Sequence, residues 1–164
     1  MSPTNWLESN CPIARVTDLL GEGWVLLLLR EAFLGTRRFN DFERELGIAR
    51  NILSDRLKKL VAAGVMERHR SAEDGRVVEY RLTQAGRELF PVLVGLGQWA
   101  GTWLCEGSQP MRVVERESGR EVAPLQVRSL SGRALGPGDV RLAPGPGADP
   151  ATAERYARAI EAAS

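Results

Sequence analysis

The sequence is poor in the residues that bind metals and form disulfides. Its 164 residues include one histidine, His69, and two cysteines, Cys11 and Cys105, which lie far apart in the chain. One subunit therefore cannot assemble a structural zinc site from histidine and cysteine, and a secreted disulfide framework is not expected. The prediction is a protein that uses no metal and no other cofactor.

Long apolar runs and an excess of one charge are also missing. The longest apolar run, residues 24–29, has six residues, whereas a signal-peptide core needs roughly 7–15 and a membrane helix about 20. Residues 1–10 contain no basic residue, so we expect a cytoplasmic protein without a membrane partner. The formal net charge of +1 indicates neither a nucleic acid nor a membrane as partner.

The chain does have a globular composition, 43% hydrophobic and 26% charged, and it divides into parts. Residues 1–106 show helical periodicity and form the predicted main domain. A small metal-free β-hairpin extension is expected at residues 107–135, a Gly/Pro-rich linker at 136–150 and a short helix at 151–164. The linker follows from composition, because nine of the nineteen residues 132–150 are glycine or proline.

The main domain has a recognisable order of elements. A helix opens at Pro12, and a second, buried helix covers residues 24–33. Asn40 and Glu43 suggest a capping box for a short third helix that ends at Leu46. After a turn at residues 47–48, a fourth helix covers residues 50–63, with Leu53, Leu57 and Leu60 facing the core.

The periodicity then changes. Residues 65–70 and 77–82 read as strands around an Asp74-Gly75 turn, and Thr83 caps a long helix that runs to about residue 106. This order predicts an α+β, mainly α fold, a winged helix-turn-helix with a small C-terminal β extension.

The extension is predicted as a hairpin of residues 111–117 and 121–128 around Ser118-Gly119, with a short further strand at residues 130–134. A unit of fewer than about 40 residues is seldom stable alone, so we expect it to dock on the winged helix. Asp149 and Pro150 are expected to open a last helix over residues 151–162.

Positive charge is local rather than global. Residues 48–70 contain six basic and two acidic residues. If the leucines of the fourth helix face inward, Asn51, Asp55, Lys58 and Ala62 face outward, with Arg50, Ser54 and Lys59 beside them. Asparagine and arginine can bond base edges, and the other cations suit phosphates. The predicted DNA-binding residues are Arg37, Arg38, Arg50, Asn51, Ser54, Arg56, Lys58, Lys59, Arg70 and Arg76.

The segments CPIARVTDLLGEGWVLLLLREAFLGTRRFNDFERELGIARNILSDRLKKLVAAGVM and VEYRLTQAGRELFPVL resemble the HxlR-type winged-helix transcriptional regulators, relatives of the MarR proteins. The resemblance covers roughly residues 11–105. It implies a homodimeric, non-enzymatic regulator of double-stranded DNA whose first and last helices build the dimer interface. It also implies that Arg50, Asn51, Ser54, Arg56 and Lys58 face DNA, with Arg76 near a flanking minor groove.

The sequence departs from this family pattern at two places, the start of the fourth helix and the tip of the wing. Ala49 stands where relatives often have Ser or Thr, so the fourth helix lacks a side-chain cap worth about 1 kcal/mol. Glu73 and Asp74 lie beside Arg76 and weaken its attraction to phosphates. The expected target is a pseudo-palindromic operator with half-sites about one helical turn, or a multiple of it, apart.

What controls binding is left open. Cys11 precedes the first helix, where the helix dipole favours a reactive thiolate. Some HxlR-type proteins have such a cysteine. The alternative is that Cys11 is a small apolar residue packed in the dimer interface. A small aromatic ligand among Trp6, Trp24, Trp99 and Trp103 is a second candidate, again with packing as the alternative.

An enzyme is not expected. His69 lies on a predicted strand at a surface position, and the sequence has neither a glycine-rich phosphate loop nor a nucleophile–base arrangement. The competing function is a winged-helix protein–protein interaction module that does not bind DNA.

Overall fold

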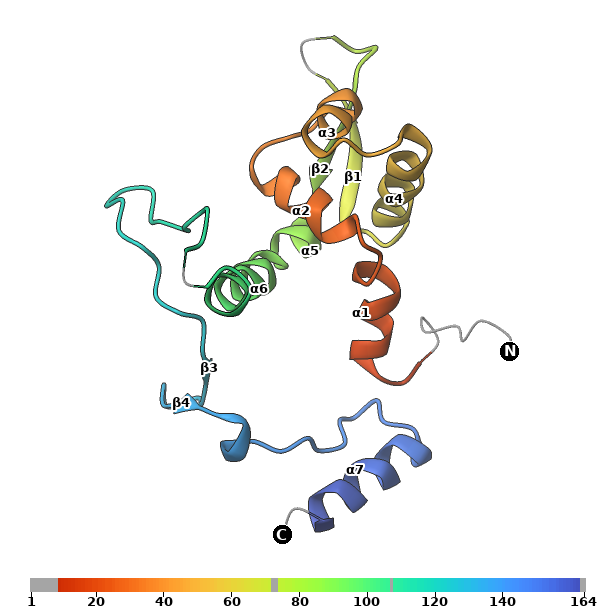
Figure 1. Cartoon of the computed structure of the whole chain (residues 1–164). Coiled ribbons are helices and arrows are strands. Elements are labelled where there is room, and N and C mark those ends of the chain that lie inside the picture. Colours follow the sequence, from red (N-terminus) through yellow and green to blue (C-terminus); the bar gives the residue numbers. More distant parts are fainter. Residues whose placement is uncertain (1–8, 72–73, 107, 163–164) are drawn as a thin grey trace. The chain divides into compact units, whose positions relative to one another are not determined.

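The computed structural model describes residues 9–71, 74–106 and 108–162 (Figure 1). The predictions on Trp6 and Glu73 therefore lie outside the described residues. The chain forms two compact units: Leu19–Leu125, and Met1–Asp18 together with Gln126–Ser164. None of the described helices is long and apolar enough to cross a membrane.

Four helices open the chain as predicted. They are α1 (Pro12–Leu20), α2 (Val25–Phe33), α3 (Phe39–Leu46) and α4 (Arg50–Ala62). Pro12 begins α1, where its missing N–H costs nothing. Gly47 ends α3 with φ 61°, the left-handed conformation that glycine adopts without strain, and so makes the tight turn into α4.

The two wing strands pair in antiparallel register. β1 (Met66–Arg70) and β2 (Val78–Leu82) place Met66 opposite Leu82 and Arg70 opposite Val78. A third segment joins them: Arg38 bridges Glu79, and the Tyr80 N–H donates to the Arg37 carbonyl at 2.7 Å. Residues 37–38 thus extend the wing sheet, which sequence periodicity did not predict.

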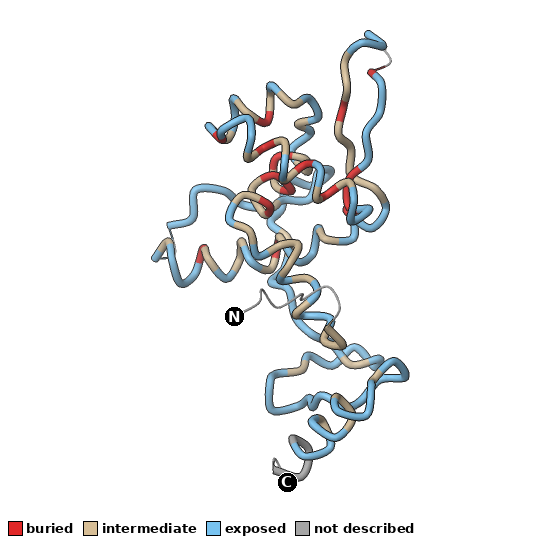
Figure 2. Tube along the Cα trace, turned by 90° about the vertical axis from the view of Figure 1, so that its right-hand side faces the viewer, coloured by how far each residue is buried: buried red, intermediate tan, exposed pale blue. Residues whose placement is uncertain are grey.

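One apolar core holds the winged helix together. The fully buried side chains come from α2, α3, α4 and β1. Figure 2 marks the buried residues in red along the chain trace. Leu53, Leu57 and Leu60 have no exposed surface, which confirms the predicted inner face of α4. The largest buried side chains are Phe42, Leu28, Leu29, Leu53, Leu57, Leu60, Met66 and Val25.

The predicted capping box at the start of α3 is wrong. Arg38 is the N-cap residue, in an extended conformation, and no side chain caps the helix. The chain leaves the wing sheet at Arg38 and turns directly into the helix, so the N–H groups of Asp41 and Phe42 donate to the Arg38 carbonyl. Asn40 is already the second residue of α3.

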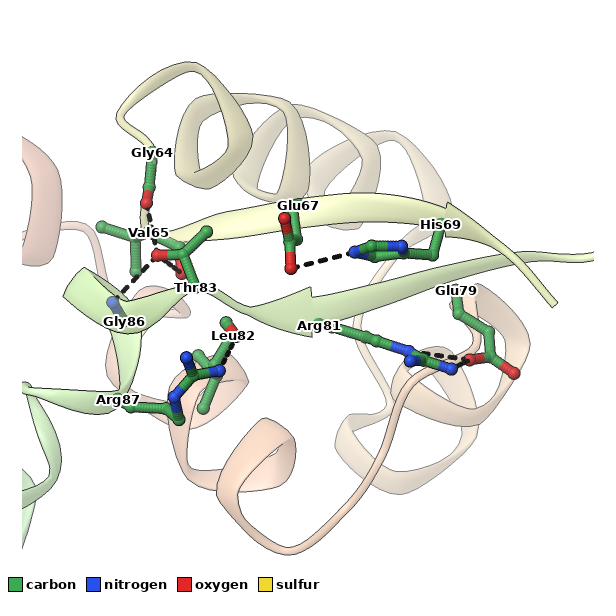
Figure 3. A network of polar contacts seen from close by, with 10 residues as sticks. All are labelled: Gly64, Val65, Glu67, His69, Glu79, Arg81, Leu82, Thr83, Gly86 and Arg87. Atoms are coloured by element: carbon green, nitrogen blue, oxygen red, sulfur yellow. Dashed lines mark hydrogen bonds and ion pairs between the residues drawn. The ribbon is translucent and has the colours of Figure 1, made fainter. Parts of the chain in front are cut away.

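The single long helix predicted after Thr83 is two helices, α5 (Gln84–Arg87) and α6 (Phe90–Trp103). Pro91 is the reason, because it has no N–H to donate to the Arg87 carbonyl and its ring would clash there. Thr83 does cap α5: its hydroxyl accepts from the Gly86 N–H at 3.1 Å and donates to the Gly64 carbonyl at 2.6 Å (Figure 3). Gly86 is required there, since a Cβ would lie 2.1 Å from the Val65 carbonyl oxygen.

The predicted hairpin over residues 111–128 forms only in part. The turn at Ser118-Gly119 is present, with Gly119 at φ 67°, but the pairing is reduced to a single bridge between Val114 and Glu121. The chain then runs along α6, where the Gln98 side chain accepts from the Leu125 N–H at 2.8 Å and donates to the Ala123 carbonyl. The compact unit that contains the winged helix thus runs on to Leu125.

The other unit contains small elements. β3 (Val127–Arg128) pairs with β4 (Ala134–Leu135) around Gly132, so residues 130–132 form the turn and the second strand lies later than predicted. A short 3-10 helix, η2 (Pro137–Asp139), and α7 (Pro150–Ala162) follow. Asp149 caps α7 as predicted, accepting from the Thr152 N–H at 2.8 Å. Asn10 holds the preceding turn by donating to the Gly147 carbonyl.

Candidate nucleic-acid interface

The candidate interface is built on α4, which is fixed at both ends by glycine. Gly47 precedes it and Gly64, with φ 70°, follows it. Ala49 is the N-cap residue and makes no side-chain hydrogen bond, as the sequence predicted. Because three leucines bury the inner face, the opposite face of this helix points away from the core.

The outer face carries the predicted polar residues. Asn51, Asp55 and Lys58 are exposed, and Lys58 is 77% exposed with its Nζ 3.9 Å from Asp55 Oδ1. Within the described ranges, the Asn51 side chain has no hydrogen-bond partner, so its amide is available to an adenine edge. Ser54 lies beside this face and is half-buried.

Arg50 joins the two helices of the helix-turn-helix. It is 64% exposed, lies 2.5 Å from Glu43 and packs over the Phe39 ring at 4.9 Å. Its guanidinium also donates to Asn40 at 3.4 Å. The Arg50 cation is thus held at the start of α4, next to the turn.

Arg56 and Lys59 are placed differently from the other cations of α4. Both contact Glu22, in the turn before α2: Arg56 Nε lies 2.5 Å from Glu22 Oε2 and Lys59 Nζ 2.7 Å from Oε1. Arg56 is only 26% exposed and Lys59 32%. The sequence predicted DNA-facing cations at both positions, whereas the fold pairs them with a carboxylate from a distant part of the chain.

The wing carries the remaining predicted cations. Arg70 ends β1 and is exposed, and Arg76 in the hairpin loop is 95% exposed. The Arg76 N–H donates to Asp74 Oδ1 at 2.9 Å, which shapes the turn, and the Arg76 guanidinium lies 3.6 Å from the same carboxylate. His69 is exposed, as predicted, and its ring lies 2.9 Å from Glu67 (Figure 3).

Arg37 and Arg38, both exposed, sit on the third segment of the wing sheet, beside Glu79. Glu79 is buried and accepts from Arg81 at 2.8 Å (Figure 3). The hydrogen bonds from Arg81 lower the pKa of the Glu79 carboxyl against the opposing effect of burial, and Ser71 and Arg37 lower it further. The segment that carries these two arginines is joined to β2 by backbone pairing, beside a buried carboxylate that sequence reasoning missed.

The predicted control residues are spread over the chain. Trp24 packs against the core at the start of α2, whereas Trp99 and Trp103 on α6 are 57% and 71% exposed. Cys11 is partly exposed and directly precedes α1, and its N–H donates to Ser9 Oγ. Cys105 is also a partly exposed free thiol, just after α6.

A helix-turn-helix with a polar outer helix, joined to a basic hairpin, defines the class of winged-helix transcriptional regulators. A crystal structure of PA1607, described as a candidate transcription factor, is similar with a TM-score of 0.80 and 44% identity. The likeness covers 85% of this chain and 99% of that one. The similarity therefore includes residues that follow the winged helix.

Other similar proteins are also named as regulators. An uncharacterised HTH-type transcriptional regulator of Mycobacterium tuberculosis H37Rv, Rv3095, is 41% identical over 137 residues, 82% of this chain and 86% of that protein. The reduced form of the redox regulator HypR is similar with a TM-score of 0.50 and 28% identity, over 59% of this chain and 99% of that one.

The model of the HxlR-like helix-turn-helix family matches residues 19–108. The chain belongs to this family and is a transcriptional regulator of the HTH type. The matched relatives are named as regulators and not as enzymes.

Proposed function

We propose that the protein is a homodimer that binds a pseudo-palindromic operator in double-stranded DNA, with α4 in the major groove. The observation that carries this proposal is the outer face of α4, where Asn51 and Lys58 are exposed on a helix whose leucines pack into the core. Asparagine in this place suits base edges and lysine suits phosphates.

The other cations have supporting roles in this proposal. Arg50, beside the turn, and Ser54 contact DNA at the edges of α4, while Arg37, Arg38, Arg70 and Arg76 approach phosphates from the wing sheet. Asp74 partly neutralises Arg76, so the contribution of the wing tip is smaller than that of α4. Arg56 and Lys59 lie on the flank of α4, where both form ion pairs with Glu22.

An apolar stripe on α6 supports the dimer. Val92, Leu96, Trp99 and Trp103 recur at spacings of four, three and four residues, and each is between 46% and 71% exposed. Such a stripe is the pattern by which two helices pack against each other. We assign Trp99 and Trp103 to this subunit interface, because both lie on the stripe.

The control that we propose acts through the Cys11 thiol. The similar structure HypR is named a redox regulator, and Cys11 is a partly exposed free cysteine at the start of a helix. Oxidation or alkylation of Cys11 would then release DNA. A Cys11→Ser protein should keep its DNA when treated with quinone or peroxide; release by this variant would exclude Cys11 as the control point.

A selection experiment tests the function itself. The purified protein should select from a random duplex library a sequence with two related half-sites, about one helical turn or a multiple of it apart. Its affinity for that duplex should fall with salt, by a log–log slope of about −0.9 for each phosphate neutralised. A protein that selects no sequence and shows no salt-dependent duplex binding would instead be a protein–protein interaction module.

A further inference from the structure

Glu22 ties the start of the winged helix to α4. It lies in the turn between α1 and α2, and its two carboxylate oxygens each take one cation of α4. Arg56 and Lys59 are three residues apart, so they lie on the same side of the helix in successive turns. One carboxylate therefore holds α4 at two points along its axis.

These pairs differ from the other ion pairs of α4 in their surroundings. Arg50 and Lys58 are 64% and 77% exposed, whereas Arg56, Lys59 and Glu22 are all about one-third exposed or less. Glu22 Oε2 and Arg56 Nε are shielded from solvent, and neither has a well-aligned hydrogen-bond partner among the described residues. Each atom thus depends on the opposite charge of the other, because removing one partner of a shielded pair leaves an uncompensated charge.

The position of these ion pairs matters because the leucines alone do not fix every motion of α4. Leu53, Leu57 and Leu60 hold the helix on the core by apolar packing. Because hydrophobic attraction is non-directional, only the fit of these side chains opposes a small rotation of the helix about its axis. Two ion pairs on one flank oppose rotation of the helix about that axis. The direction of Asn51 and Lys58 follows from that rotation.

We propose that Glu22 is a specificity-determining positioning residue, which acts through Arg56 and Lys59 to set the orientation of α4 and withholds the Arg56 guanidinium from indiscriminate phosphate contacts. This inference rests on the proposed DNA-binding function. It predicts opposite effects on two kinds of DNA. Without the Glu22 carboxylate, the Arg56 guanidinium loses its ion pair and becomes available to any duplex, while the outer face of α4 loses its fixed direction toward base edges.

The test compares Glu22→Gln with the wild-type protein on two duplexes: the sequence that the wild type selects from a random library, and a scrambled duplex of the same length and composition. The ratio of the two affinities should fall about tenfold, which corresponds to about 1.4 kcal/mol. The salt slope for the scrambled duplex should become steeper, because more phosphates are neutralised. Glu22→Asp should restore part of the ratio.

The matched control is Glu45→Gln, which removes the same charge from an exposed carboxylate paired with Arg44 on α3. If removal of the charge acts only through electrostatics, the affinities for the selected and the scrambled duplex rise alike, which is the result expected of Glu45→Gln. If the substitution only destabilises the protein, both affinities fall alike. An unchanged affinity ratio in Glu22→Gln overturns the inference. If the wild type selects no sequence at all, the proposed function fails and the inference fails with it.

Discussion

The winged-helix unit, Leu19–Leu125, and the unit formed by Met1–Asp18 and Gln126–Ser164 are held together by different forces. Where burial is described, all buried residues lie between Val25 and Gly101, within the first unit. The second unit relies on exposed hydrogen bonds, such as those of Asn10 to Gly147 and of Arg133 to Asp139.

This difference separates global from local stability. Burial of apolar side chains is the main favourable term in folding, whereas exposed hydrogen bonds contribute little because water competes for them. Segments with few buried side chains open at little cost in free energy. The winged helix should therefore unfold as one cooperative unit, and substitutions beyond residue 125 should leave its transition unchanged.

The largest difference is expected between two leucine substitutions. Leu57→Ala in α4 removes a side chain with no exposed surface and should lower the free energy of unfolding by roughly 2–5 kcal/mol. Leu130→Ala, in the fully exposed turn of the second unit, should change it by less than about 0.5 kcal/mol. Urea denaturation followed by tryptophan fluorescence measures both values. An equal decrease in the free energy of unfolding in the two variants would show that the second unit has a core of its own.

A smaller difference is expected between two helix caps. Thr83→Ala removes the hydroxyl that links Gly64 to Gly86, and should lower the free energy of unfolding by about 1 kcal/mol. Asp149→Ala removes the cap of α7 and should reduce helix content in far-UV circular dichroism without shifting the cooperative transition. A shift of that transition in Asp149→Ala would contradict the separation of the two units.

Acid should act on the second cap in the same way as the substitution. The Thr152 N–H and hydroxyl lower the pKa of Asp149 in the folded chain. Capping by the carboxylate is therefore fully present above the ordinary pKa of an aspartate, near 4, and is lost as the pH falls through the lowered value. The helix signal of α7 should decrease in that range, and Asp149→Asn should lack this step.

The sequence predicted elements whose signals are local. The leucine spacing located α4 and its inner face, Gly47 located the turn, and Asp149 located the start of α7. The errors came from competing local signals. Asn40 and Glu43 have the spacing of a capping box, but Arg38, which bridges Glu79, is the N-cap residue of α3, two residues earlier than predicted. Pro91 was a local signal that could have located the break between α5 and α6.

The candidate site was predicted in part for the same reason. Asn51 and Lys58 are exposed because helical periodicity places them opposite the leucines. The pairing of Arg56 and Lys59 with Glu22 joins residues more than thirty positions apart, and periodicity carries no signal for such a pairing. The pKa of Glu79 depends likewise on Arg37, more than forty positions away, which comes near it only in the folded sheet.

The most direct test of α4 as the DNA-reading helix is the salt dependence of DNA binding by Lys58→Ala, measured beside Arg141→Ala on the duplex that the wild type selects. Lys58 is on the outer face of α4, and Arg141 is an exposed cation of the second unit. Lys58→Ala should bind more weakly, with a log–log salt slope shallower by about 0.9 for each phosphate that is no longer neutralised, while Arg141→Ala should match the wild type. Wild-type affinity and slope in Lys58→Ala would contradict the assignment of α4 to the major groove.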